Sequence, residues 1–199
     1  HQEKFDAIVH LAARAGVRPS ISAPQLYYDT NVSGTLHLLE AARQTGVGRF
    51  VFASSSSVYG ISKTVPFSES LHLTQTISPY AATKIAGEFL CSTYSHLYQM
   101  RIVALRFFTV YGPRGRPDMM AYKVADNILF GRQVPIYNGG QMHRDWTFID
   151  DIVQGVVAAI DRPLGFEIVS VALDTNGMAA VRCACSSTSA SRCRKSRIG

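Results

Sequence analysis

Apolar residues recur along the chain in two alternating patterns. Short apolar runs rich in β-branched residues predict strands buried on both faces, and they cover residues 5–13 (FDAIVHLAA), 49–53 (RFVFA) and 101–108 (RIVALRFF). Between and after them, apolar residues at helical spacing predict helices over residues 24–46, 79–98 and 118–130. A strand, helix, strand, helix, strand order builds a parallel sheet with right-handed crossovers. The chain is therefore predicted to be an α/β protein.

The pattern loosens after residue 130. VPIY (134–137) and RDWTFI (144–149) flank Asn138-Gly139-Gly140, which predicts a hairpin-like connection. Asp150 or Asp151 is predicted to cap a helix that runs to Ile160, and FEIVSVAL (166–173) has the composition of a last strand. These pieces predict part of a small second lobe beside the sheet.

The charge of the chain is unevenly distributed. A formal charge of +6 would suggest nucleic-acid binding, but five of the 20 basic residues follow residue 181, where no acidic residue occurs. The rest of the chain is nearly neutral, so no basic groove and no nucleic-acid partner are predicted. No apolar stretch approaches the roughly 20 residues that cross a bilayer, and the first residues do not resemble a secretory signal. We therefore expect no membrane association and a cytoplasmic location.

The last part of the chain differs in composition from the rest. We predict a main body over residues 1–165 and a divergent tail of irregular or disordered structure over residues 166–199. The tail holds three of the four cysteines (Cys183, Cys185 and Cys193). A zinc site would need a fourth ligand that the sequence does not offer, so no metal is predicted.

Tyr80 and Lys84 are the first candidates for chemistry. They lie four residues apart near the start of the helix predicted over 79–98, so both side chains share one face. A lysine ammonium close to a tyrosine hydroxyl favours the phenolate and is expected to lower the tyrosine pKa from its usual value of about 10. Tyr80 is then a candidate general base, although a Tyr-x-x-x-Lys pair also occurs by chance on solvated helices.

A run of four serines, Ser54 to Ser57, follows the strand at 49–53. Serines are common in turns because their hydroxyls bond nearby backbone groups, and that reading needs no function. In an open α/β sheet, however, ligands bind beyond the carboxyl ends of the strands. A serine hydroxyl there could share a substrate proton with Tyr80.

Six ordered stretches identify a resemblance to a known family. The chain resembles the nucleotide-sugar epimerases of the extended short-chain dehydrogenase/reductases from Phe5 to Gly165. The stretches are HLAARAGVR, YYDTNVSGTLHLLEAA, FASSSSVYG, SPYAATKIAGE, LRFFTVYGPRGRPDM and RDWTFIDDIVQGV. The resemblance implies a partial Rossmann-like parallel sheet with flanking helices, plus part of a small substrate-binding lobe. It also implies NAD as cofactor, a UDP-sugar as substrate and a homodimer in which helices 24–46 and 79–99 pair.

The resemblance also assigns roles to residues. Tyr80 would be the acid/base, Lys84 would hold the nicotinamide ribose, and Ser55 would position the sugar. Further cofactor contacts would come from Leu11, Ala12, Ala13, Thr30 and Phe108. Of these residues, Leu11, Ala12 and Phe108 could instead serve only the core, and Thr30 could only cap or pack.

The substrate anions would be bound mainly by arginines, because a guanidinium offers planar paired donors to phosphate and carboxylate. The candidates are Arg18, Arg116 and Arg144, with Arg14, Arg106 and Arg114 as weaker ones, although an arginine in a loop is commonly only solvated. Thr109 stands where galactose-type epimerases usually have Asn. This difference favours the branch that converts UDP-glucuronate to UDP-galacturonate by transient oxidation at C4, over UDP-glucose 4-epimerization.

Three rival functions remain at this stage. Related 4,6-dehydratases carry an Asp-Glu pair where Ser56 and Ser57 stand, and related decarboxylases carry Glu at the second position, so the serines favour an epimerase. A non-catalytic nucleotide-sugar or NAD-binding module is the third rival. It is supported by the lack, within these 199 residues, of a glycine-rich dinucleotide fingerprint. We therefore interpret the chain as a fragment that by itself binds NAD poorly and has little or no activity.

Overall fold

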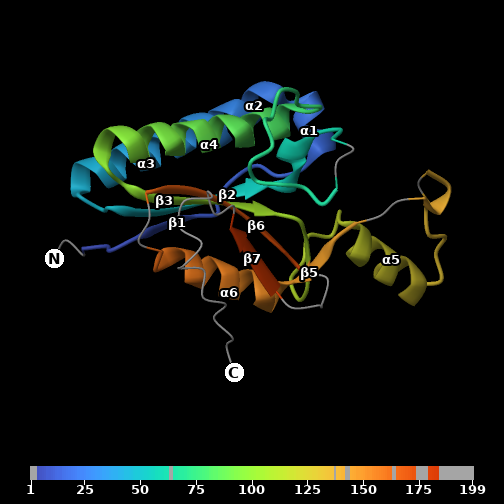
Figure 1. Ribbon diagram of the computed structural model, residues 1–199. Helices are drawn as coiled ribbons and strands as arrows, with labels where there is room; N and C mark the ends of the chain where they lie inside the picture. Colours follow the sequence, from blue (N-terminus) through green and yellow to red (C-terminus); the bar gives the residue numbers. More distant parts are fainter. Residues whose placement is uncertain are drawn as a thin grey trace.

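A five-stranded sheet forms the centre of the molecule (Figure 1). The structure is a computed structural model, and it describes residues 4–62, 65–136, 138–141, 144–162, 165–173 and 179–183. The strand order is β1-β2-β3-β6-β7. The strands are β1 (Ile8–His10), β2 (Arg49–Ser55), β3 (Arg101–Phe107), β6 (Phe166–Leu173) and β7 (Ala179–Cys183). The first four are parallel to one another, and β7 is antiparallel to β6. The predicted parallel sheet is confirmed.

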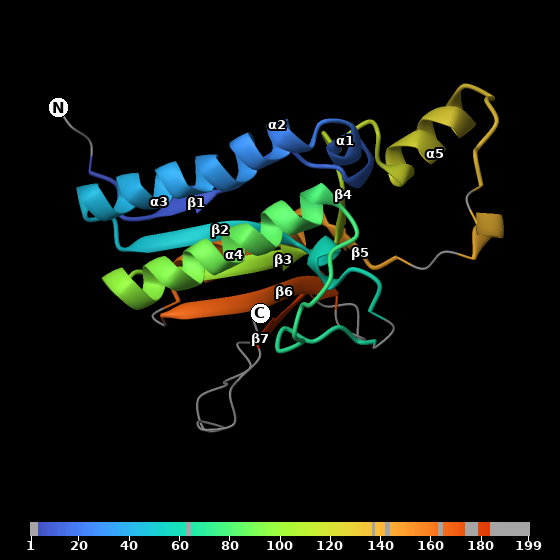
Figure 2. The same cartoon turned by 90° about the horizontal axis from the view of Figure 1, so that it is seen from above.

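Helices cover both faces of this sheet (Figures 1 and 2). On one face lie α1 (Val17–Ser22), α2 (Pro24–Tyr28), α3 (Gly34–Thr45) and α4 (Pro79–Tyr98). The opposite face carries α6 (Ile149–Ile160), while α5 (Met120–Leu129) projects away from the sheet (Figure 1). The predicted helix over 24–46 is present in three parts, because a π-helical turn at Asp29–Ser33 joins α2 to α3. No helix of the described part of the chain is long and apolar enough to span a membrane.

Three predictions for the second half of the chain are corrected. In the described residues 134–136 and 144–149, the predicted hairpin pairing is absent. Instead, β5 (Trp146–Phe148) pairs in parallel with β4 (Thr109–Tyr111), a partner distant in sequence that no local pattern could indicate. The α6 helix starts at Ile149 with Phe148 as N-cap, so Asp150 and Asp151 lie in its first turn rather than cap it.

The third correction concerns the predicted irregular tail. The expected strand over 166–173 is confirmed, so the tail cannot begin at residue 166. Val169 and Val171 are buried, and β6 pairs with β3 from Phe166 to Val171. The strand β7 continues the sheet to Cys183. Residues 184–199, with Cys185 and Cys193, lie outside the described residues.

The central strands divide the apolar core into two layers. Phe50 and Phe52 of β2 face α3 and α4, where they pack with Leu39 and Cys91. Val51, between them on the strand, faces the other way and packs in the layer beneath α6, as the alternation of side chains along a strand requires. The sheet is therefore buried on both faces, and its polar chemistry is confined to its ends.

Gly87 of α4 is where the helix approaches the sheet most closely. A Cβ atom on this residue would lie 2.3 Å from Cζ of Phe52. In an open helix, replacing glycine by alanine stabilises by about 1 kcal/mol, but overpacking a core costs about 1–3 kcal/mol. We expect Gly87→Ala to lower the free energy of unfolding by about 1–2 kcal/mol, as measured by urea denaturation.

Gly34 provides the matched control for this prediction. It lies at the start of α3, and a Cβ atom there would have no neighbour within 4 Å. Gly34→Ala should therefore stabilise the protein slightly, in the direction of helix propensity. If both variants shifted stability in the same direction, close packing of Gly87 on Phe52 would be refuted.

Candidate active site

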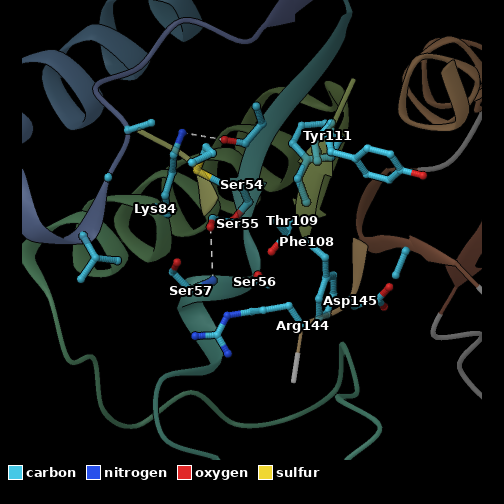
Figure 3. Close-up of a pocket in the computed structure, with 18 of the residues that line it drawn as sticks. Ser54, Ser55, Ser56, Ser57, Lys84, Phe108, Thr109, Tyr111, Arg144 and Asp145 are labelled. Carbon is cyan, nitrogen blue, oxygen red and sulfur yellow. Dashed lines mark hydrogen bonds between the residues drawn. The ribbon is translucent and has the colours of Figure 1, made fainter. Parts of the chain in front are cut away.

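A large cavity opens at the carboxyl ends of the parallel strands. Its volume is about 1410 Å³, and segments that follow β1, β2 and β3 all contribute to its wall. Figure 3 shows Ser54, Ser55, Ser56, Ser57, Lys84, Thr109 and Arg144 around it. The position agrees with the general rule for ligand sites in open α/β sheets. The structure thus brings together residues that are up to 161 positions apart in the chain, from Leu11 to Ala172.

Tyr80, Ser55 and Lys84 meet at this cavity, as the sequence predicted. Tyr80 lies in the first turn of α4 and lines the cavity together with Ser55 at the end of β2, whose hydroxyl acts to lower the pKa of Tyr80. Lys84, one turn further along α4, is buried and donates a hydrogen bond from Nζ to the carbonyl oxygen of Ala53 (2.7 Å). Its Nζ lies 6.0 Å from the centre of the Tyr80 ring. A hydroxyl, a phenol and an ammonium therefore share one wall of the cavity.

The expected lowering of the Tyr80 pKa is not observed. Burial raises the pKa of Tyr80 above its usual value, and the opposing effects of the hydrogen bond with Ser55 and the charge of Arg116 are smaller. Burial likewise lowers the pKa of Lys84 to about 8. The prediction considered only the spacing of Tyr80 and Lys84, which indicates proximity but not how far the pair is removed from water.

The remaining predicted site residues fall into two groups. Leu11, Ala13, Phe108, Thr109, Arg116 and Arg144 line the same cavity as Tyr80. Ala12, Arg18 and Thr30 are exposed and are not among the residues that line it. The contacts predicted for these three residues stay predictions.

The weaker arginine candidates have different surroundings. Arg114 lines the cavity, and Arg14 is exposed on the segment after β1. Arg106 is 2% exposed and forms a two-pronged ion pair with Glu88, with nitrogen–oxygen distances of 2.9 and 2.8 Å. Because its charge is already paired inside the protein, Arg106 is not a substrate-binding arginine.

Sequence reasoning missed Asn31, which ties the cavity wall together. Its amide oxygen accepts a hydrogen bond from the backbone N–H of Arg14 (2.7 Å), and its Nδ2 donates to the carbonyl oxygen of Arg14 (3.0 Å). Nδ2 also donates to Oγ1 of Thr83 on α4 (3.0 Å). The segment after β1 is thus fixed to the helix that carries Tyr80. No local pattern marked Asn31, because its neighbours Asp29, Thr30 and Ser33 are also polar.

His10, at the end of β1, gives this region a pH dependence. It is 6% exposed and bonded through Nε2 to Oγ1 of Thr35 (3.0 Å), and burial, aided by the charge of Lys84, lowers the pKa of His10 to about 4. The unfolded chain, with a histidine pKa near 6.5, binds the proton more readily. Stability is therefore fully retained above pH 6.5 and lost as the pH falls toward 4, by about 3 kcal/mol in total.

A variant at this position isolates the effect from the titration of carboxylates. His10→Gln keeps a neutral hydrogen-bonding side chain but does not titrate in this range. The free energy of unfolding of the parent should fall relative to that of the variant between pH 7 and pH 4.5, measured by urea denaturation at each pH. A difference between the two proteins that is independent of pH would contradict buried, neutral His10.

Comparison with known proteins gives a consistent result. The model of the NAD dependent epimerase/dehydratase family matches residues 1–172. The UDP-glucuronate 4-epimerase of Thermodesulfobacterium geofontis is 47% identical over 167 residues, which cover 84% of this chain and 51% of that protein. The chain thus spans about half the length of the curated relatives it matches.

Solved structures agree with this. The UDP-glucuronic acid 4-epimerase of Bacillus cereus, in complex with UDP-glucuronic acid and NAD, is 38% identical with a TM-score of 0.78, covering 85% of this chain and 55% of that one. A dTDP-glucose 4,6-dehydratase double mutant from Streptomyces venezuelae is 35% identical with a TM-score of 0.76, covering 83% and 51%. Together with the site at the carboxyl ends of the strands, these matches establish that the chain belongs to the NAD dependent epimerase/dehydratase family.

Proposed function

We propose that this chain supplies the proton-transfer and sugar-binding part of an NAD-dependent nucleotide-sugar 4-epimerase, which converts UDP-glucuronate to UDP-galacturonate. The main support is the convergence of Tyr80, Ser55 and Lys84 on one cavity at the end of the sheet. The cavity wall is also positively charged. Its described residues include four basic side chains, Lys84, Arg114, Arg116 and Arg144, and one acidic side chain, Asp145. A doubly anionic diphosphate and a uronate carboxylate suit such a wall.

The described residues fit an NAD cofactor. The cavity is large enough for an extended ligand, and Lys84 offers donors to ribose hydroxyls from within it. Leu11, Ala13 and Phe108 provide apolar surface on the same wall. NAD, when bound, would supply the acceptor and donor of the hydride at sugar C4.

Tyr80 carries the proton chemistry in this proposal. Its phenolate oxygen takes the proton of the sugar 4-hydroxyl, and the resulting phenol returns that proton when the hydroxyl is restored on the other face. Ser55, on the same cavity wall, positions the sugar hydroxyl, and Arg116 favours the phenolate by its charge. The raised pKa of Tyr80 keeps the proton on the phenol for the returning step.

The described lining of the cavity lacks the pair of carboxylates that the rival reactions need. Elimination of water from a sugar requires a further acid and base, and Ser56 and Ser57 occupy the turn where those carboxylates would stand. Of the described residues lining the cavity, only Asp145 is acidic, and it lies immediately before β5, not in the serine turn. A single carboxylate does not provide an acid–base pair, so the site favours 4-epimerization.

A chimeric enzyme tests the proposal. Residues 1–172 replace the matching segment of the Thermodesulfobacterium geofontis relative, and the purified protein is incubated with NAD⁺ and UDP-glucuronate. NMR of the nucleotide sugars should show UDP-galacturonate, and kcat/KM should be higher for UDP-glucuronate than for UDP-glucose. A folded chimera that binds NAD but leaves UDP-glucuronate unchanged would refute the proposed activity. Equal conversion of UDP-glucose would refute the carboxylate specificity.

We also propose that the protein forms a homodimer through α3 and α4. These helices lie side by side on one face of the sheet (Figure 2). They carry the exposed apolar side chains Leu36, Phe89, Leu97 and Tyr98, which are typical of an association surface when they gather on one face. Light scattering should report a dimer, and Phe89→Glu should shift it toward monomer. A monomeric parent protein would exclude this surface as a dimer interface.

A further inference from the structure

Three buried polar residues form a row across the sheet next to the cavity. Ser54 of β2 pairs in register with Arg106 of β3, which pairs in turn with Ser170 of β6. They are 3%, 2% and 5% exposed, respectively. Because residues in register on neighbouring parallel strands face the same side, the row separates the apolar core from the carboxyl ends of the strands. The proposed activity assigns no role to this row.

Glu88 of α4 binds the first two members of the row. Its Oε1 accepts hydrogen bonds from Oγ of Ser54 (2.5 Å) and from Nε of Arg106 (2.9 Å), while Oε2 accepts from Nη2 of Arg106 (2.8 Å). Glu88 is itself 5% exposed. It lies four residues after Lys84, which bonds to Ala53. Successive turns of α4 therefore hold successive residues at the end of β2.

Tyr59 connects the other end of the serine turn to the same row. The guanidinium of Arg106 lies over the Tyr59 ring, 4.9 Å from its centre, and the Tyr59 hydroxyl is 3.1 Å from Oγ of Ser170. The turn from Ser54 to Tyr59 is thus fixed at both ends. Ser55, which lines the same cavity as Tyr80, lies between the two fixed points.

We propose that Glu88 and Arg106 are positioning residues that hold the turn 54–59 at both ends and thereby aim the Ser55 hydroxyl at Tyr80. In the proposed reaction, Glu88 and Arg106 contact neither the Tyr80 hydroxyl nor the sugar hydroxyl. Its influence reaches Tyr80 through Ser54, the adjacent Ser55 and the ring of Tyr59. The catalytic meaning of this placement rests on the proposed function, but the placement itself can be tested without turnover.

Stability alone does not explain the pair. Replacing a buried ion pair with apolar residues of similar size is often neutral or stabilising. Such a replacement, Glu88→Leu/Arg106→Met, removes equal and opposite charges and therefore leaves the net charge unchanged. It also removes every side-chain contact through which the pair holds Ser54 and the polar face of Tyr59. The double variant therefore separates positioning from folding.

The titration of Tyr80 reports the position of Ser55. The groups that face Tyr80 are Ser55 from β2, Tyr27 from α2, Lys84 from α4 and Arg116 from the segment after β4. Among them, the hydrogen bond with Ser55 is the largest influence that favours the phenolate. A Ser55 hydroxyl that is no longer aimed at Tyr80 must therefore move the titration to higher pH.

The experiment uses the 199-residue chain labelled with fluorotyrosine and followed by fluorine-19 NMR across a pH titration. The fluorinated phenol is more acidic, so it titrates before alkaline unfolding, and Tyr80→Phe assigns its signal. We expect Glu88→Leu/Arg106→Met to raise the Tyr80 midpoint in the same direction as Ser55→Ala, and by no more than that variant does. In the Ser55→Ala background the double substitution should cause no further shift.

Three results decide the matter. An unchanged Tyr80 midpoint in the folded double variant, or an undiminished shift in the Ser55→Ala background, would overturn the proposal. As a control, Asp126→Asn/Arg132→Gln removes the exposed ion pair between Asp126 of α5 and Arg132, which follows that helix. This variant should leave the Tyr80 midpoint unchanged. A shift of the Tyr80 midpoint in the control would overturn the proposal, because it would show that the loss of any ion pair moves it. If the double variant does not fold, Ser54→Ala must shift the midpoint upward. Failure here leaves the chimera assay unaffected, so the two proposals are judged separately.

Discussion

Tyr80→Phe should abolish epimerization by the chimeric enzyme while leaving nucleotide-sugar binding intact. The substitution removes one oxygen atom, and that oxygen is the group that exchanges a proton with the sugar 4-hydroxyl. Loss of a positioned acid/base typically costs about 10²–10⁴-fold in rate. We expect kcat for UDP-glucuronate to fall by that factor and the Kd for UDP-glucuronate to change by no more than a few-fold, since the ring of Tyr80 remains packed against that of Tyr27. Stopped-time NMR assays give kcat, and calorimetry gives Kd.

Tyr122→Phe is the matched control. Tyr122 lies on α5 and is 50% exposed, so the same loss of one hydroxyl should leave kcat unchanged. A substrate analogue that lacks the 4-hydroxyl can be used to measure binding without turnover. If Tyr80→Phe retained full activity, the assignment of Tyr80 as the proton-transfer group would have to be abandoned.

The parts of the fold that the sequence could predict are those specified by local patterns. The helix over 79–98 and the strands at 49–53 and 101–108 were found because their apolar periodicity is continuous and their ends carry clear signals, such as Pro79 in the first turn of α4. The pairing of β4 with β5 was missed because its two strands lie far apart in the chain. Nothing in the sequence of either strand specifies such a partner.

The candidate site shows the same division. A meeting of the serine run with Tyr80 and Lys84 could be predicted because strand order fixes which loops share an edge of the sheet, while the family resemblance singled out Ser55. The direction of the Tyr80 pKa could not, because it depends on burial by residues from several segments. Asn31 also escaped detection, since its role consists of three hydrogen bonds to residues distant in sequence. Spacing indicates which residues can meet, whereas burial determines how they behave.

Glu88→Leu alone should be among the most destabilising single substitutions in the protein. It leaves the Arg106 guanidinium 2% exposed without its carboxylate, and the Nη1 atom of Arg106 already lacks a hydrogen-bond partner among the described residues. Breaking a buried pair by removing one partner costs about 3–5 kcal/mol. We expect a loss of that size in the free energy of unfolding, measured by urea denaturation.

The second substitution should reverse most of this loss. Arg106→Met in the Glu88→Leu background removes the uncompensated charge and adds an apolar side chain that the core can accept, so the double variant should approach or exceed the parent in stability. The two substitutions are then strongly non-additive, as expected for groups in direct contact. A double variant that stays well below the parent in stability would mean that the ion pair itself stabilises the fold. In that case its main role would be structural, whereas a stable double variant with a displaced Ser55 would show that this part of the core maintains the geometry of the site.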